Sequence, residues 1–146
     1  MAVDAISRSY GMQDFRRLRV WQEGRTLTVA IHEATRSIRP GEAPNLRSQL
    51  MRSSMSISAT VAEGAGRETR ADFARFISMA IASASEVEHH LSVCDDLGLI
   101  ERAVVEQLTE RVVRLRRMLF GLRRTLLMKD AQHRNGVDAN RSAGTQ

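Results

Sequence analysis

Two closely spaced glycines, Gly64 and Gly66, stand between an acid and an arginine in the segment A-E-G-A-G-R. Glycine-rich turns hold phosphate groups in nucleotide-binding proteins, because backbone N–H groups approach the ligand there. The known loops follow a strand and need a lysine or a third glycine, whereas this segment has Thr69 at the third position and follows a helical pattern. It is therefore interpreted as a structural turn in which Gly64 or Gly66 takes a positive φ and Arg67 reaches back to Glu63.

Metal binding and nucleophilic catalysis have weaker candidates. Glu86 and His89 form one E-x-x-H motif, but a di-iron bundle needs two such motifs and two further glutamates. Cys94 is the only cysteine and is expected to be a small buried side chain. No G-x-S-x-G elbow selects a nucleophilic serine. The sequence therefore predicts no metal, no cofactor and no catalytic residue, and hence a protein that is not an enzyme.

Arginine side chains offer a third kind of chemistry, the binding of phosphate groups. The chain has 22 basic residues, of which Lys129 is the only lysine, a net charge of +5 and a pI near 10.8. The guanidinium group stays charged and its planar fork fits phosphate oxygens. The predicted nucleic-acid-binding residues are Arg16, Arg17, Arg67, Arg70, Arg75, Arg114, Arg117, Arg123 and Arg124. Glu110 shares a helix face with Arg114 and Arg117, so part of this charge is expected to be self-paired.

The arginine content leaves an alternative open. Codon preference alone would also enrich arginine, and a charged helix face is often only a solvated surface. Aromatic residues make up 4% of the chain, so any nucleic-acid binding is expected to act through the phosphate backbone and to read sequence weakly.

Four amphipathic helices are predicted to carry these groups. The first covers residues 14–38 with Asp14 as its N-cap, and the second runs from 44 or 45 to 63. Thr69 and Asp72 open the third, which ends at Gly98, and the fourth covers 100–128. Short connections make an all-α, antiparallel up-down-up-down four-helix bundle the expected fold. Residues 1–13 are expected to form a flexible arm and residues 129–146 a disordered tail.

The fourth helix carries more apolar surface than a bundle core requires. Beside its main stripe, a second set on another side comprises Val105, Val113, Phe120 and Leu127. One stripe suffices for packing within a bundle, so the second predicts a further partner, and we expect the chain to form an oligomer.

Length and composition set the frame for these patterns. At 146 residues and 16.4 kDa, with 42% hydrophobic residues, the chain is expected to fold as one domain. It has no run approaching about 18 apolar residues and no signal-peptide pattern at its start, so a cytoplasmic protein is expected.

An ordered series of motifs runs along the chain: L-R-V-W-Q at residues 18–22, the segment 44–57, A-E-G-x-G-R at 62–67 and D-F-x-R-F-I-x-x-A at 72–80. In this order the motifs resemble the bacterial 23S rRNA intervening sequence proteins, and the similarity covers about residues 15–127. The resemblance implies a four-helix bundle that assembles into a homopentameric ring with a basic central channel. The chain also looks like the accessory variability determinant of diversity-generating retroelements, a basic pentamer that binds nucleic acid and a reverse transcriptase.

Together, the residues and the resemblance predict a non-enzymatic, oligomeric protein that binds RNA or an RNA–DNA hybrid through an arginine-rich surface. The alternative is a protein-interaction scaffold that docks a partner enzyme such as a reverse transcriptase.

Overall fold

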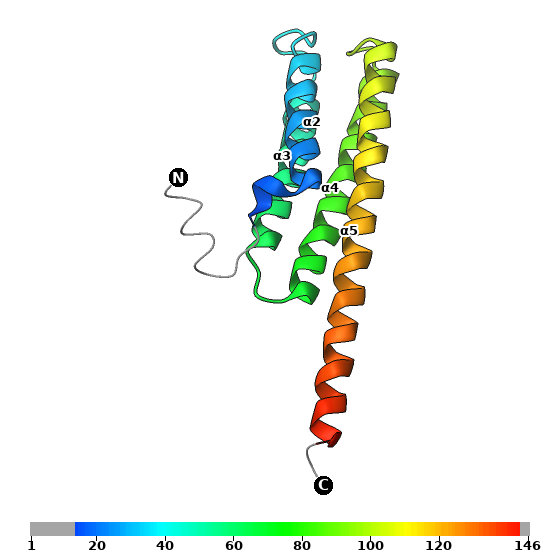
Figure 1. The fold of residues 1–146 in the computed structure, drawn as a ribbon. Helices are drawn as coiled ribbons and strands as arrows, with labels where there is room; N and C mark the ends of the chain where they lie inside the picture. Colours follow the sequence, from blue (N-terminus) through cyan, green and yellow to red (C-terminus); the bar gives the residue numbers. More distant parts are fainter. Residues whose placement is uncertain (1–13, 144–146) are drawn as a thin grey trace.

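The structure, a computed structural model, describes residues 14–143, with side chains described to residue 137. Its elements are η1 (Phe15–Arg17), α2 (Arg19–Thr35), α3 (Pro44–Ala65), α4 (Arg70–Asp96) and α5 (Arg102–Ala143). Each α-helix packs against the next along the chain, and α5 also packs against α2. Successive helices run in opposite directions (Figure 1). The predicted all-α up-down bundle is confirmed, whereas the predicted arm over residues 1–13 lies outside the described residues.

The apolar stripes predicted from the sequence form the core. Each helix turns one stripe toward the bundle axis, and burying one such side chain stabilises the fold by about 1.5–3 kcal/mol. The large side chains buried most completely are Leu27, Ile31, Ile38, Leu50, Ile57, Val61, Ile77, Val87, Leu91, Val112 and Leu119. All four α-helices contribute to this core, so they are expected to fold as one unit.

The beginning of the first predicted helix differs from the expectation. Asp14 caps the short helix η1 instead, because its carboxylate accepts the backbone N–H of Arg16 at 3.1 Å. Leu18 then takes an extended conformation, with φ −75° and ψ 122°, before α2 begins. The side-chain hydrogen bond from Arg16 is the main reason that the pKa of Asp14 is lowered.

The end of α4 confirms the predicted role of Gly98. This residue has φ +64°, a left-handed conformation that glycine adopts without a steric penalty. The backbone N–H of Leu99 donates to the carbonyl oxygen of Cys94 at 2.9 Å, which closes a Schellman turn. The chain therefore reverses sharply between α4 and α5.

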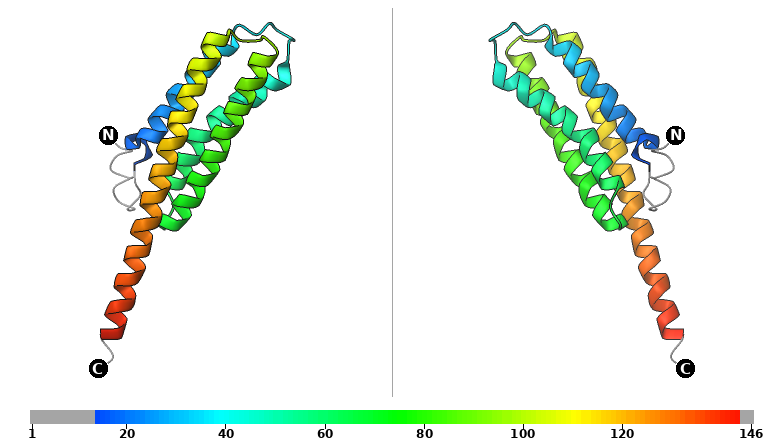
Figure 2. Two further views of the ribbon diagram at one scale, coloured as in Figure 1. Left: turned by 90° about the vertical axis from the view of Figure 1, so that its right-hand side faces the viewer. Right: turned by 90° about the vertical axis from the view of Figure 1, so that its left-hand side faces the viewer.

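The predicted tail after Met128 is partly helical. Helix α5 continues to Ala143 and is 42 residues long, or about 63 Å, so its end projects beyond the other helices (Figure 2). Extending an existing helix needs no new nucleus, no proline follows Met128, and Arg134 pairs with Asp130 at 3.0 Å. The expectation of disorder over residues 129–143 is therefore corrected, and residues 144–146 are not described.

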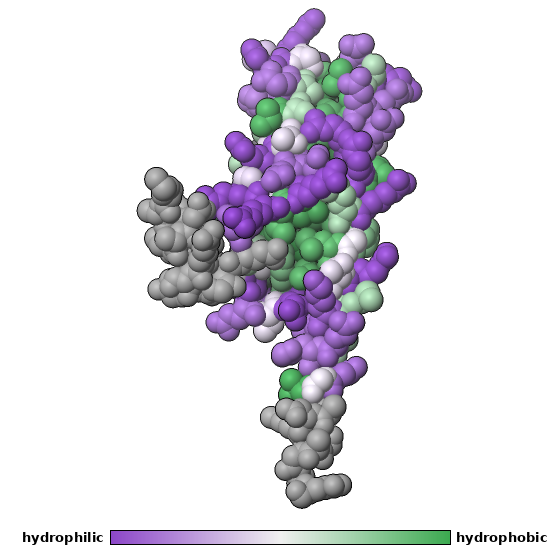
Figure 3. Space-filling view, viewed as in Figure 1, coloured by the Kyte–Doolittle hydropathy of each residue, from purple (hydrophilic) through white to green (hydrophobic). Residues whose placement is uncertain are grey.

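The helices have unequal lengths, which leaves one side of the bundle partly open. Helix α2 has 17 residues and begins about halfway along the bundle, whereas α4 has 27 (Figure 1). Figure 3 shows hydrophobic surface in the middle of this face, beside the start of α2. The open face (the surface between the start of α2 and α5) thus exposes apolar area that a full-length fourth helix would cover. No helix within residues 14–143 is long and apolar enough to cross a membrane.

Candidate nucleic-acid interface

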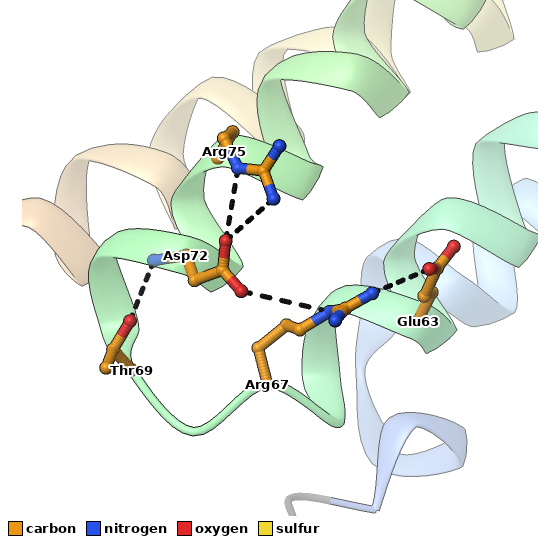
Figure 4. Close-up of polar contacts among 5 residues, drawn as sticks. All are labelled: Glu63, Arg67, Thr69, Asp72 and Arg75. Atoms are coloured by element: carbon orange, nitrogen blue, oxygen red, sulfur yellow. Dashed lines mark hydrogen bonds and ion pairs between the residues drawn. The ribbon is translucent and has the colours of Figure 1, made fainter.

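The turn between α3 and α4 is held by its own side chains. Arg67 donates to Glu63 at 2.7 Å, as predicted, and its Nε lies 3.8 Å from the Asp72 carboxylate. That carboxylate also accepts two hydrogen bonds from Arg75, at 2.9 and 3.1 Å. The hydroxyl of Thr69 accepts the backbone N–H of Asp72 at 3.1 Å, which confirms the predicted cap. Figure 4 shows these five residues, here called the corner cluster, linked across the turn.

The two arginines of the corner cluster also cover an aromatic ring. The guanidinium carbon of Arg67 lies 4.3 Å from the centroid of the Phe76 ring, and that of Arg75 lies 5.2 Å from it. Both distances fall within the range of cation–π contacts. Because these guanidinium groups already contact carboxylates and a ring, the structure gives Arg67 and Arg75 a role in the turn itself.

Gly64 is needed at this turn because it lacks a side chain, and not because of its backbone angles. The prediction that Gly64 or Gly66 has a positive φ is wrong, since Gly64 is helical and Gly66 has φ −87°. A Cβ added at Gly64 would lie 2.7 Å from the Cβ of Phe76 and 2.8 Å from a ring carbon of Phe73. Gly64 therefore allows the first turn of α4 to pack closely against the last turn of α3.

Two further predicted arginines have partners within the fold. Arg16 forms an ion pair with Asp14 at 2.9 Å. Arg123 on α5 donates to the hydroxyl of Ser78 on α4 at 2.7 Å, and both side chains are partly buried. These contacts stabilise η1 and the α4–α5 packing respectively.

Arg111 and Arg116 also join α5 to its neighbours, a role that the sequence did not indicate. Arg111 donates to the hydroxyl of Thr26 on α2 at 3.2 Å. Arg116 forms an ion pair with Glu88 on α4 and contacts Ser85 there. Both arginines therefore face helix–helix seams.

Three further arginines of α5, together with Phe120, form an exposed row, here called the basic stripe: Arg114, Arg117, Phe120 and Arg124. Spacings of three and four residues place them along one side of the helix. All four are exposed, and among the described residues the three arginines have no hydrogen-bond or ion-pair partner. The expected self-pairing with Glu110 is not found. The stripe therefore presents unneutralised guanidinium groups to solvent.

The surroundings of the basic stripe carry one sign of charge. Residues 111–129 contain six arginines and Lys129 but no aspartate or glutamate. Acids gather instead at the start of α5, where Glu106 and Glu110 line a shallow hollow with Asp95 and Asp96. This separation leaves the middle of α5 as a strongly positive surface that favours an anionic partner.

Arg17 and Arg70 are exposed and, within residues 14–143, have no hydrogen-bond or ion-pair partner. They lie on η1 and at the first residue of α4, and η1 packs against α2 and α3 rather than against α5. The structure thus does not gather all nine predicted arginines on one surface. It brings Arg114, Arg117 and Arg124 together.

The cysteine and histidine residues considered for catalysis and metal binding lie in the following surroundings. Cys94 is fully buried and burial raises the pKa of its thiol, so it packs as a small apolar side chain. Burial, with a smaller effect of the charge of His89, lowers the pKa of His90. No group of three or more histidine, cysteine, aspartate or glutamate side chains within the described residues is placed to hold a metal ion.

Comparison with known proteins identifies the family. Residues 16–121 match the family described as 23S rRNA-intervening sequence protein. The fold is similar to a crystal structure of a protein of unknown function from the S23 ribosomal protein family of Bacteroides thetaiotaomicron, with TM-score 0.66 and 23% identity. That match covers 70% of this chain and 96% of the other. Among curated proteins none matches. The match over most of the four-helix region shows that the chain belongs to the 23S rRNA-intervening sequence protein family.

Proposed function

We propose that this chain is a non-enzymatic nucleic-acid-binding protein, that RNA or an RNA–DNA hybrid is its ligand, and that the basic stripe is the contact surface. One observation carries the proposal: three exposed arginines that have no hydrogen-bond or ion-pair partner among the described residues lie on one side of α5, within a run of residues that has no acid. The arginines of the corner cluster, which hold the turn, contact the carboxylates of neighbouring residues. The three arginines of the basic stripe contact no carboxylate within the described residues.

The spacing of the basic stripe suits a phosphate backbone. Arg114 and Arg124 are ten residues apart, which is about 15 Å along a helix, so the stripe is long enough to contact more than one phosphate of a strand. Arginine forms paired hydrogen bonds to phosphate oxygens without reading the base. The expected binding is therefore strong at low salt and weak in sequence preference.

The test measures fluorescence anisotropy of labelled 20-nucleotide RNA, the matching RNA–DNA hybrid and duplex DNA between 50 and 200 mM salt. Counterion release predicts a linear fall of log affinity with log salt, with a slope of about −0.7 for each contacted single-strand phosphate. If the pure protein binds none of these probes at 50 mM salt, the proposed function is wrong.

The active form is proposed to be an oligomer, with the ring-like homopentamer implied by the family resemblance as the specific expectation. Part of the second stripe, Val105, is buried within the bundle, but Leu127 is 38% exposed and the neighbouring Met128 is 57% exposed. Val137 is 43% exposed on the projecting end of α5. Apolar side chains on a projecting helix are better covered by other copies of the chain than by water.

Light scattering tests the assembly directly. The pentamer predicts a mass of about five times 16.4 kDa at micromolar concentration, and the double change Met128→Glu and Val137→Glu is expected to lower that mass. The matched control is Val29→Glu, an equally exposed position on α2. A monomer mass for the unchanged protein would contradict the proposal.

A second candidate function is a scaffold that docks a partner enzyme such as a reverse transcriptase. The open face beside the start of α2 favours it, because apolar surface of this kind marks protein-interaction sites (Figure 3). Recovery of one stoichiometric protein partner from cells that express the protein, after nuclease treatment, would support this function. Loss of every partner on nuclease treatment would oppose it.

A further inference from the structure

We propose that Phe120 is a base-stacking residue, so that the basic stripe selects single-stranded nucleic acid, whose bases are unpaired, over duplex. This inference rests on the proposed nucleic-acid binding and names the form of ligand that the site prefers. It differs from the expectation drawn from the sequence, in which Phe120 belonged to an apolar stripe for oligomerisation.

Phe120 is the exception among the aromatic rings of the described chain. Phe73 and Phe76 are each 5% exposed, and Phe15 and Trp21 pack edge to face with ring centroids 5.1 Å apart. Phe120 is 48% exposed and is the only phenylalanine, tyrosine or tryptophan in α5. The other aromatic rings are buried or packed against another ring, so the exposure of Phe120 is particular to its own position.

The ring of Phe120 is accessible as well as exposed. Within the described residues no guanidinium group lies over it, in contrast to the Phe76 ring, which carries two. A shallow hollow beside it is lined by Arg123, Arg124, Leu127 and Met128. A Cβ added at the adjacent Gly121 would meet nothing within 4 Å. A flat ligand thus has space beside the ring.

Charge decides which occupant this surface favours. A second copy that met the stripe with its own stripe, by two-fold symmetry, would place like charges face to face, which is unfavourable. A neighbour in a head-to-tail ring would meet the stripe with a different surface, and the light-scattering measurement below tests that occupant. A nucleic-acid strand supplies the opposite charge for the arginines and a base for the ring. Arginines lie three residues before and four residues after Phe120, so phosphates on both sides of a stacked base have a cation within reach.

Stacking also provides the selectivity. In a duplex both faces of each base are covered by neighbouring pairs, whereas a single strand can place a base on an aromatic side chain. Loss of one such contact typically lowers affinity by roughly tenfold or more. Phosphate contacts alone would not distinguish the two forms in this way.

The experiment compares Phe120→Leu with the unchanged protein on three probes: single-stranded RNA, duplex RNA of equal length, and an abasic single strand of equal charge. We expect Phe120→Leu to bind single-stranded RNA about tenfold more weakly and to bind the other two probes within about twofold of the unchanged protein. Phe120→Trp should retain the affinity, and its added indole fluorescence should be quenched by the single strand. Met55→Ala is the matched control, since Met55 is a 55% exposed apolar side chain without a ring on α3, a helix that does not pack against α5 in the described structure.

The outcomes separate the two proposals. If the unchanged protein binds no probe, the proposed function itself fails. If it binds but Phe120→Leu has unchanged affinity for single strands, or if Met55→Ala weakens binding equally, stacking is refuted while phosphate binding stands. A fall in oligomer mass by light scattering in Phe120→Leu would instead make Phe120 a subunit contact and would overturn the inference.

Discussion

The corner cluster and the basic stripe contain similar residues, but the arginines have partners in the corner cluster and none within the described residues in the basic stripe. Both combine arginines with a phenylalanine, but in the corner Arg67 and Arg75 contact Asp72 and cover Phe76. On α5, Arg117 and Arg124 have no partner within the described residues and Phe120 is left uncovered. The difference shows that arginine content alone does not identify an interface. The informative observation is an arginine for which the fold supplies no acid.

Each region also contains a glycine, and the two glycines have opposite surroundings. A Cβ added at Gly64 would lie 2.7 Å from Phe76 and 2.8 Å from Phe73 of α4, whereas a Cβ added at Gly121 would meet nothing within 4 Å. A side chain is therefore excluded at the first position and tolerated at the second.

Gly64→Ala is expected to have the largest effect, a loss of about 3 kcal/mol in the free energy of unfolding, because the added methyl group forces α3 and α4 apart. The measurement is denaturant unfolding followed by circular dichroism. Gly121→Ala is the matched control and should stabilise the protein by up to about 1 kcal/mol, since alanine favours an exposed helix position. Equal stability of the two variants would show that the corner is not tightly packed.

The triple change of Arg114, Arg117 and Arg124 to Gln should come next. At 0.1 M salt each single-strand phosphate contact contributes about 0.7 log units, so three lost contacts weaken RNA binding roughly 100-fold, and the salt slope falls by about 2. Unfolding should be nearly unchanged, because these side chains stabilise nothing in the fold. The control, with the same charge change, is Arg39, Arg47 and Arg52 to Gln outside α5. An equal loss of RNA affinity in this control would show that the basic stripe contributes only through the net charge of the protein.

Changing Arg67 and Arg75 to Gln is expected to give the reverse pattern. The ion pairs are exposed and each contributes less than about 1 kcal/mol, and each cation–π contact contributes a similar amount, so the variant should lose about 1–2 kcal/mol of stability. RNA affinity should change by less than about threefold. A larger loss of affinity with intact stability would return these two arginines to the interface predicted from the sequence.

The same contrast explains what could be predicted from the sequence. Helix periodicity found the bundle, the stripe of α4 and the role of Gly98, because these depend on spacing along one helix. The contact of Arg67 with Glu63 was also accessible, since the two residues are one turn apart. Most features that local spacing determines were therefore predicted correctly, although the pairing of Glu110 with Arg114 was not found among the described residues.

Features that depend on a second helix were not predicted. A side chain is excluded at Gly64 by the phenylalanines of α4. Arg123 donates a hydrogen bond to Ser78, which lies 45 residues earlier in the sequence. The sequence likewise placed Phe120 among the apolar residues, because only the packed structure shows which members of that set remain exposed. The helix beyond Met128 was missed for another reason: its polar composition resembles a tail, but it continues a helix that already exists.

The smallest expected effect concerns only the corner cluster and tests the cap at Thr69. Thr69→Ala removes the hydroxyl that accepts the backbone N–H of Asp72 and should cost about 1 kcal/mol in the free energy of unfolding, whereas Thr69→Ser keeps the hydroxyl and should cost little. Neither variant should alter RNA affinity, because the cap lies on α4 and the basic stripe on α5. If Thr69→Ala and Thr69→Ser unfold alike, the hydrogen bond does not hold the first turn of α4. The packing at Gly64 and the contacts of Asp72 would then suffice to fix the corner.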